Sequence, residues 1–144
     1  MITIDRLAPE DRDAWQELFR GYSEFYGREL TAPVAERAWA ELQREERIHA
    51  RGARLDGRLV GIVHFLVHPS TTTADVCYLQ DLFTAPDLRG RGVGAALIAA
   101  VANWAREREC FRVYWMTHET NARARRLYDH VAANGGFIRY ELDL

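Results

Sequence analysis

The sequence predicts a single α/β domain in which a mixed, mostly antiparallel sheet is flanked by helices. The chain has 144 residues, which suits one domain, and 48% of them are hydrophobic against 28% charged, as in ordinary globular proteins. Apolar residues recur with helical spacing on both sides of a central region made of runs that favour strands. Neither a linker nor an internal repeat interrupts the pattern, so we expect one domain over residues 1–144.

The N-terminal third predicts a short strand and two helices. Isoleucines and a leucine within residues 2–7 indicate the opening strand. Aromatic and apolar residues recur at helical intervals over residues 10–26, and Gly27 is a suitable end for that helix. Thr31 and Pro33 are typical of a helix start, and the second helix that they open leads into a charged stretch.

The middle of the chain predicts an antiparallel meander. Asp56-Gly57 is a hairpin signal between two runs that favour strands. A Ser-Thr-rich turn separates the second run from a third, which ends before a proline. The three predicted strands cover residues 48–55, 59–68 and 76–84.

The C-terminal part alternates between helices and strands. A strongly apolar helix is predicted from residue 93 to 104, and it is followed by a strand over 112–117. A further helix is expected over 121–133, where Gly135-Gly136 breaks the helical pattern. Residues 137–142 are predicted to form a closing strand.

Charge and hydropathy argue against nucleic-acid and membrane partners. The 19 basic and 21 acidic residues give a formal charge of −2, and every basic residue is arginine. The longest apolar stretches, 59–67 and 93–102, fall short of the ~18 residues that span a bilayer. The N-terminus lacks the basic region and apolar core of a secretory signal. These features favour a cytoplasmic protein.

Cysteine and histidine spacing predicts no metal site. Cys77 and Cys110 are far apart and form no CxxC motif, which favours free thiols in a reducing compartment. His64 and His68 lie four residues apart on a strand-like run rather than on a helix, so they are not a helical zinc pair. All five histidines are interpreted as structural or surface residues.

The most informative segment is Arg89-Gly90-Arg91-Gly92-Val93-Gly94, between a predicted strand and a predicted helix. A helix start presents unpaired N–H groups and a partial positive charge, and glycine allows close approach of an anion. Residues 89–126 add eight arginines against three glutamates. A phosphate or pyrophosphate is the natural ligand of such a loop. A glycine-rich turn with solvated arginines is the alternative.

Two nucleotide-binding patterns fit the loop poorly. The Walker pattern requires Gly-Lys-Ser/Thr, and this chain has no lysine. The dinucleotide fingerprint requires G-x-G-x-x-G after the first strand of a parallel unit, whereas Gly90, Gly92 and Gly94 follow a predicted antiparallel meander with G-x-G-x-G spacing.

Motifs in the expected order resemble the GNAT family of N-acetyltransferases over essentially the whole chain. Arg89-x-x-Gly92-x-Gly94 is similar to the family's Q/R-x-x-G-x-G/A acetyl-CoA loop. Residues 121–128 resemble its N-x-x-A-x-x-L-Y segment, and Gly136-Phe137 resembles the G-F that follows. Residues 78–83 look closest to the yeast-type histone and polyamine acetyltransferase branch. The resemblance implies a GNAT-like fold with splayed central strands.

The resemblance also implies a set of residues that bind acetyl-CoA. The strand that ends at Thr84 would expose backbone groups to the pantetheine arm, and the glycine loop would hold the pyrophosphate. Arg123 or Arg126 could meet the ribose phosphate. The expected cofactor-binding residues are Leu82, Phe83, Thr84, Arg89, Gly90, Arg91, Gly92, Val93, Gly94, Ala95, Asn121 and Ala124.

Tyr128 and Asp81 are the expected catalytic residues. By the resemblance, the Tyr128 phenol would act as general acid toward the departing CoA thiolate; from spacing alone, a core tyrosine is the simpler interpretation. Asp81 is the best candidate to take the proton of the amine, and burial is expected to raise its pKa. A structural carboxylate is the alternative. Gln80 cannot titrate, and Glu119 and Tyr78 are weaker candidates.

The expected reaction is acetyl transfer from acetyl-CoA to a primary amine by direct attack, without an acyl-enzyme and without a metal. The acceptor is left open among polyamines, amino acids and basic peptides. Glu24 and the aromatic residues Tyr22, Phe25 and Tyr26 could line the acceptor side, although helical spacing already explains three of them as core. A non-catalytic acyl-CoA-binding or sensor module is the alternative function. The single predicted closing strand favours a homodimer.

Overall fold

The computed structural model describes residues 1–144, and its strands form one mixed sheet as predicted. The sheet order is β1-β2-β3-β4-β5, and only the β4–β5 pair is parallel. The predominance of antiparallel pairs follows from the short turns of the meander, which reverse the chain twice. The strands are β1 (Ile2–Asp5), β2 (His49–Leu55), β3 (Arg58–His68), β4 (Val76–Thr84) and β5 (Arg112–Tyr114).

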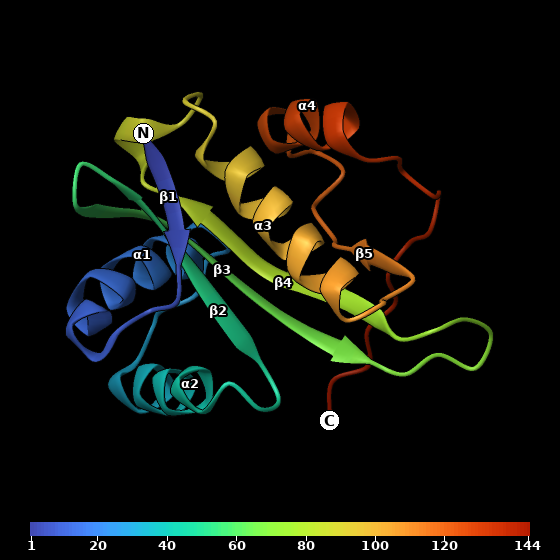
Figure 1. Ribbon diagram of the computed structural model, residues 1–144, viewed down its shortest axis with the longest axis horizontal. Coiled ribbons are helices and arrows are strands. Elements are labelled where there is room, and N and C mark those ends of the chain that lie inside the picture. Colours follow the sequence, from blue (N-terminus) through green and yellow to red (C-terminus); the bar gives the residue numbers. More distant parts are fainter.

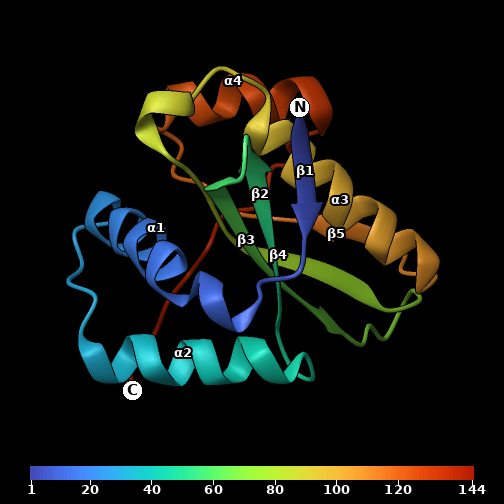
Figure 2. The same ribbon diagram turned by 60° about the vertical axis from the view of Figure 1, so that its left-hand side comes forward.

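Four α-helices flank the sheet, with α1 and α2 on one face and α3 on the other (Figures 1 and 2). The fourth helix lies beside the N-terminal end of α3. Short 3-10 turns precede α1 and follow β4, at Pro9–Asp11 and Pro86–Leu88. No helix combines the length and the apolar character needed to cross a bilayer. The α-helices are α1 (Arg12–Phe25), α2 (Ala32–Arg44), α3 (Val93–Glu107) and α4 (Ala122–Val131).

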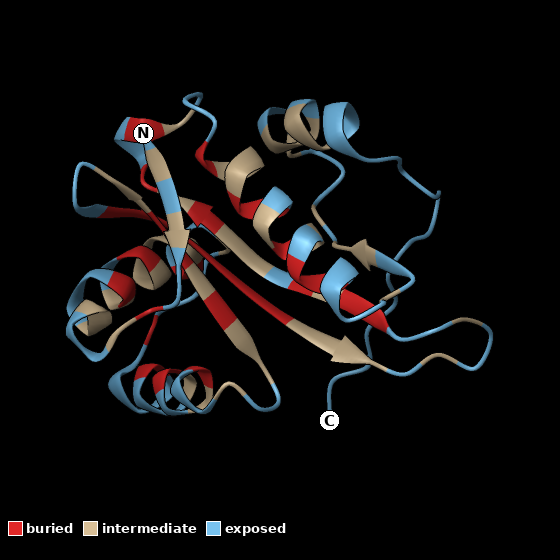
Figure 3. Ribbon diagram, in the orientation of Figure 1, coloured by how far each residue is buried: buried red, intermediate tan, exposed pale blue.

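The two faces of the sheet carry separate hydrophobic clusters. One cluster joins Trp15 and Trp39 of α1 and α2 to inward residues of the strands. The other joins the apolar face of α3, including Leu97 and Val101, to the opposite side of the strands. The buried positions accordingly follow the inner stripe of α3, run over residues 59–65 of β3 and recur along β4 (Figure 3). The helical spacing of the apolar residues therefore places α1, α2 and α3 correctly against the sheet.

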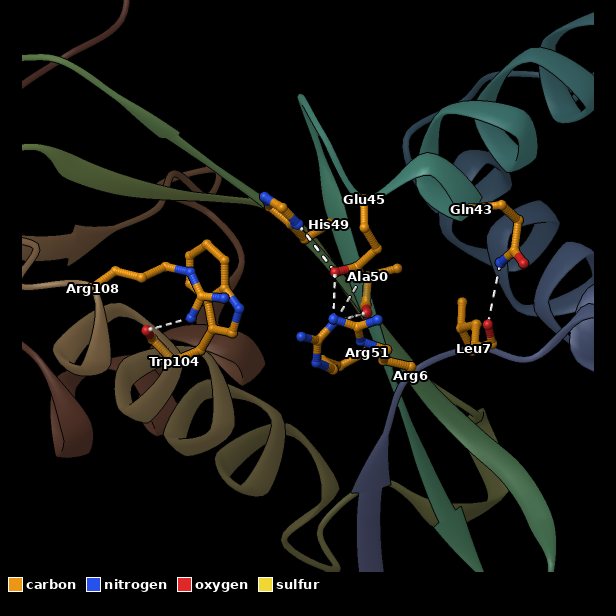
Figure 4. A network of polar contacts seen from close by, with 9 residues as sticks. All are labelled: Arg6, Leu7, Gln43, Glu45, His49, Ala50, Arg51, Trp104 and Arg108. Atoms are coloured by element: carbon orange, nitrogen blue, oxygen red, sulfur yellow. Dashed lines mark hydrogen bonds and ion pairs between the residues drawn. The ribbon is translucent and has the colours of Figure 1, made fainter.

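A polar network fixes the end of α2 against β2 (Figure 4). Glu45 follows α2 with a φ of 54°, in the left-handed region. Its carboxylate accepts from Arg51 at 2.7 Å, contacts His49 Nδ1 at 3.2 Å and lies 3.7 Å from Arg6. The charged stretch that ends the second helix in the sequence therefore serves as its structural anchor.

The predicted closing strand over residues 137–142 is wrong for the isolated chain. These residues form no strand, and the segment leaves α4 as an exposed tail (Figures 1 and 3). Phe137, Ile138, Tyr140 and Leu142 are 92%, 76%, 88% and 82% exposed. A strand needs paired backbone groups to be stable, and no strand of the chain pairs with this segment. The predicted strand over 112–117 also ends early, at Tyr114.

Candidate active site

The two central strands of the site separate part of the way along the sheet, as the family resemblance implied. Only Val76–Tyr78 of β4 pairs with β5, and the pairing ends at Tyr114. Residues 79–84 of β4 therefore have no strand neighbour on that side. Backbone N–H and C=O groups left unpaired at such an opening are ready to bind an extended ligand.

A β-bulge in β4 decides which way Asp81 points. His64 pairs with Asp81 and Phe65 pairs with Leu79, so Gln80 is an extra, unpaired residue. Leu79 packs in the cluster beneath α3, whereas Asp81 reaches His64, which contacts α1. In a regular strand these two residues would face the same side of the sheet. The bulge therefore turns Asp81 toward α1, and Gln80 itself is exposed.

The glycine loop leads directly into α3 in a conformation that glycine allows. Gly90 and Gly92 have φ values of 78° and 83°, in the left-handed region that glycine enters without steric cost. The helix begins at Val93 without a side-chain cap, and the first intrahelical bond at this end runs from the Ala96 N–H to the Gly92 carbonyl. The N–H groups of residues 93–95 therefore have no partner within the helix, which is what the predicted anion site requires.

A cavity of about 540 Å³ lies between the end of β4, the glycine loop, α4 and the C-terminal part of α1. Every predicted cofactor residue except Arg91 lines it, and so does Tyr128. Arg91 is exposed beside the cavity. The lining residues are Tyr22, Phe25, Tyr26, Leu82, Phe83, Thr84, Leu88, Arg89, Gly90, Gly92, Val93, Gly94, Ala95, Asn121, Arg123, Ala124, Arg126, Leu127 and Tyr128.

The end of the cavity at the glycine loop is positively charged. Arg89, Arg123 and Arg126 line it, and none of the three forms an ion pair within the chain. The guanidinium of Arg89 lies 5.4 Å from the ring centre of Phe83, which holds it at the cavity. Three cations without acidic partners, next to a free helix N-terminus, suit a ligand with several phosphates.

Asn121 lines the cavity and caps α4. Its Oδ1 accepts from the Ala124 N–H at 3.4 Å, and its Nδ2 donates to Thr117 Oγ1 at 3.2 Å. These bonds fix the start of α4 and, with it, the position of Tyr128 about two turns further on. The Asn121 side chain thus binds the neighbouring backbone.

Tyr128 has both core and cavity contacts. Its ring packs edge-on against Trp115, with centroids 5.5 Å apart, and it adjoins the cluster beneath α3. Burial raises the pKa of Tyr128 to about 12, with Tyr26 adding to the effect. The phenol is therefore protonated at neutral pH. Because its ring lines the cavity, a ligand can receive the hydrogen bond that the phenol offers.

Asp81 lies beneath the cavity wall and is held as a carboxylate. Burial alone would raise its pKa, but the hydrogen bond and the charge of His64 oppose burial, with smaller contributions from Tyr22 and Arg28, and together they lower the pKa below its ordinary value. The expectation of a raised pKa is therefore wrong, because the partners of the charged form win over desolvation. Asp81 does not itself line the cavity, whereas Tyr22, which interacts with Asp81, does.

The predicted acceptor side is only partly assembled. Tyr22, Phe25 and Tyr26 line the cavity, with the Tyr22 and Tyr26 ring centres 5.0 Å apart. Glu24 is exposed and lies outside it. The pKa of Tyr26 is raised by burial and by the nearby Asp81 charge. This end of the cavity therefore combines aromatic faces with one negative charge beneath them.

Sequence reasoning missed two groups of this site. His64 is buried, in agreement with the structural role expected for it, but its contact with Asp81 was not expected. Leu88 and Leu127 complete the cavity wall and were not expected there. The bulge that joins His64 to Asp81 has no sequence signal, whereas Leu127 could have been found from its place beside Tyr128 on the apolar side of α4.

Comparison with known proteins gives a consistent result. The model of the acetyltransferase (GNAT) family matches residues 12–132. The D-amino-acid N-acetyltransferase HPA3 of Saccharomyces cerevisiae is 30% identical over 97% of this chain and 89% of its own length.

Solved structures show the same fold. The ribosomal-protein-alanine N-acetyltransferase of Brucella melitensis is 25% identical with a TM-score of 0.81, and both chains are covered completely. AAC(6')-Iy in complex with a bisubstrate analogue, CoA-S-monomethyl-acetylneamine, has a TM-score of 0.86 at 18% identity. That alignment covers 100% of this chain and 99% of the other.

Proposed function

This chain belongs to the GNAT family and is an acyltransferase, and from that premise we propose that it transfers acetyl from acetyl-CoA to a primary amine by direct attack. One observation carries the proposal. A single cavity connects the cationic glycine loop, the Tyr128 phenol and the aromatic wall above Asp81. Each of these three parts suits one part of the reaction: the phosphates, the leaving sulfur and the amine.

The residues at the glycine loop fit the phosphates of acetyl-CoA. The free N–H groups at the start of α3 and the three unpaired arginines would bind them, and Gly94 keeps the approach open. A Cβ at Gly94 would lie 3.2 Å from Leu127, so a side chain there would fill the space between α3 and α4. The unpaired part of β4, including Leu82 and Thr84, would bind the pantetheine arm through its backbone. Acetyl-CoA supplies an activated thioester.

The chain's own groups can manage the protons of a direct transfer. A primary amine like that of lysine has a pKa of about 10.4 and arrives protonated, so it must lose a proton before its nitrogen can attack. Asp81, as a carboxylate, would accept that proton through water or through the Tyr22 hydroxyl. As the nitrogen–carbon bond forms and the carbon–sulfur bond breaks, Tyr128 would donate to the leaving sulfur.

The cysteines support a mechanism without an acyl-enzyme. Cys77 is buried, and burial raises the pKa of its thiol to about 12. A thiol protonated at neutral pH is a poor nucleophile. Cys110 also has a pKa raised by burial, and neither cysteine lines the cavity. Both are free thiols, which supports our placement of the protein in the cytoplasm.

We infer that the acceptor is a small amine or a basic peptide. The aromatic wall of Tyr22 and Tyr26, with the Asp81 charge beneath it, suits a cationic amine. The yeast relative is named for acetylating D-amino acids, which makes amino acids the first class to test, with polyamines and lysine-rich peptides beside them.

The test of this function is CoA release from acetyl-CoA in the presence of pooled polyamines, amino acids or lysine-rich peptides. Release that depends on one pool would support the transferase and give the acceptor class. Tight acetyl-CoA binding without release from any pool would contradict the proposed amine acceptors and favour a sensor module.

The glycine loop can be tested with a matched pair of substitutions. Gly92 and Gly57 have φ values of 83° and 81°, and an added Cβ would touch nothing at either position. Alanine in this conformation should cost about 1 kcal/mol of unfolding free energy at both sites. Only Gly92→Ala should raise the Kd for acetyl-CoA, by up to about 5-fold, in so far as the free loop relieves this strain instead of lowering the unfolding free energy and must regain the left-handed conformation to bind. An equal Kd in both variants, measured by calorimetry, would exclude this role for the loop.

We also propose that the chain forms a homodimer through its tail. In the tail, apolar Ile138, Tyr140 and Leu142 alternate with charged Arg139 and Glu141, a pattern typical of a half-buried strand. Burying an exposed isoleucine or leucine is worth about 1.5–3 kcal/mol, and a second copy offers the same segment as a partner strand.

Light scattering should therefore give the mass of two chains. Ile138→Ser should shift the protein toward the monomer, whereas Arg139→Ser, on the other side of the same segment, should leave the dimer largely intact. A wild-type protein that is monomeric at working concentration would contradict the proposal.

A further inference from the structure

We propose that His64 is a positioning residue for Asp81: it holds the carboxylate in its ionised form with the proton-accepting side turned toward Tyr22 and the cavity. This inference rests on the proposed function, in which Asp81 takes the amine proton. His64 does not touch the cavity, so any effect that it has on the reaction must pass through Asp81.

The geometry is a buried chain of hydrogen bonds from α1 to β4. Trp15 Nε1–H donates to His64 Nε2 at 3.0 Å, and His64 Nδ1 lies 2.8 Å from Asp81 Oδ2. Trp15 is fully buried, His64 is 2% exposed, and the Asp81 side chain is 13% exposed. The ring of Phe19 lies edge-on to His64 at 5.2 Å and excludes water from that side.

The chemistry of the two hydrogen-bond partners, Trp15 and Asp81, fixes which ring nitrogen of His64 carries the proton. An indole nitrogen can only donate, so the Nε2 atom of His64 must accept and carries no proton. The single ring proton is then on Nδ1, where it points at Asp81 and requires the carboxylate to accept. The Nδ1–H tautomer of His64 therefore has both ring nitrogens in use and acts on Asp81 as a hydrogen-bond donor.

Other polar groups around Asp81 leave this role to His64. Tyr22, which lines the cavity, also interacts with Asp81 and links it to the substrate side. The remaining groups that affect the charge of Asp81 or are affected by it are Tyr26 and Arg28, which follow α1, and Tyr78 on β4. Of all these groups, only His64 is buried and fixed by a further partner behind it.

The first experiment observes His64 in the wild-type protein. Long-range proton–nitrogen correlation spectra distinguish the Nδ1–H form, the Nε2–H form and imidazolium. We expect the Nδ1–H form in the wild type, because Nε2 accepts from Trp15. In Trp15→Phe the freed Nε2 should allow the Nε2–H form to appear. An Nε2–H form in the wild type would overturn the inference.

The second experiment compares His64→Leu, His64→Asn and the control His68→Leu on the same strand. In His64→Leu we expect kcat to fall up to about 100-fold, as when a catalytic group is misplaced by an ångström, with an unchanged KM for acetyl-CoA. The fall of kcat/KM on the acidic side of its pH profile should also move to higher pH, because the Asp81 carboxylate loses its hydrogen-bond donor. His64→Asn should recover part of both effects, since an amide N–H can replace Nδ1–H. His68, bound to Tyr114 instead, should show neither effect.

The outcomes separate this inference from the proposed function. In one outcome the Asp81→Asn variant is inactive, but the acidic side of the kcat/KM pH profile does not move in His64→Leu or His64→Asn. That outcome would support the transferase and reject the role of His64. A fully active Asp81→Asn variant would reject the base assignment itself. If His64→Leu fails to fold, the wild-type spectra and His64→Asn still decide the matter.

Discussion

The Asp81→Asn variant is expected to lose about 10²- to 10⁴-fold in kcat, the usual contribution of a positioned general base. Asparagine has the same shape, and its Oδ1 can still accept from His64, so the buried hydrogen bond is retained. What disappears is the capacity to take a proton from the amine. The KM for acetyl-CoA should stay within about twofold, because removing a group that acts only in the transition state leaves ground-state binding unchanged.

The control for this variant is Asp75→Asn, which removes an exposed carboxylate just before the same strand and away from the cavity. Steady-state kinetics over a range of pH give a second readout. Because the pKa of Asp81 lies below its ordinary value, wild-type activity should persist at acidic pH until that lowered pKa is reached. The stability gained from the ionised carboxylate should be lost over the same fall in pH. Wild-type rates in Asp81→Asn would show that another group accepts the proton.

The Tyr128→Phe variant is expected to lose a similar factor, about 10²- to 10⁴-fold in kcat. Phenylalanine keeps the edge-on contact with Trp115 and the packing against α3, so the fold and the acetyl-CoA site should remain intact. A free thiol has a pKa of about 8.5, below that of the Tyr128 phenol, so the phenol mainly stabilises the leaving thiolate through a strong hydrogen bond.

Tyr114→Phe provides the matched control, since Tyr114 is half-buried on β5 and its hydroxyl serves His68 rather than the cavity. A more acidic thiol leaving group needs less help from the phenol. The difference between wild type and Tyr128→Phe should therefore shrink with acyl donors whose thiols have lower pKa values. If turnover in Tyr128→Phe equals that of the wild type, Tyr128 is a core residue and the leaving group is stabilised elsewhere.

Most of the fold could be predicted from the sequence because its elements are defined locally. Asp56-Gly57 sets the hairpin between β2 and β3, and the apolar repeat around Leu97 sets the buried face of α3. The prediction of a closing strand was wrong because an alternating pattern indicates only that one side of a segment should be buried. It does not state which chain supplies the cover, and within one chain nothing pairs with the tail.

The candidate site divides in the same way. The glycine loop could be read from the sequence, since left-handed backbone and an uncapped helix start both depend on residues 90–93 alone. The direction and ionisation of Asp81 could not. They depend on the unpaired Gln80 and on His64, which is 17 positions away in the sequence.

The sequence by itself thus determined the α/β class and predicted the phosphate-binding loop and, through the family resemblance, the two expected catalytic residues. Spacing, turn chemistry and motif order are properties of the sequence, and they can be recognised without knowledge of tertiary contacts. Only the tertiary structure decided that β4 and β5 separate beyond Tyr78. It also brings the arginines of the glycine loop and of α4 into one cavity with the Tyr128 phenol. Finally, it places Asp81 against His64, which is in turn bound by Trp15. Strand register and burial bring distant residues together, and the balance between desolvation and hydrogen bonding that sets a pKa exists only once they have met.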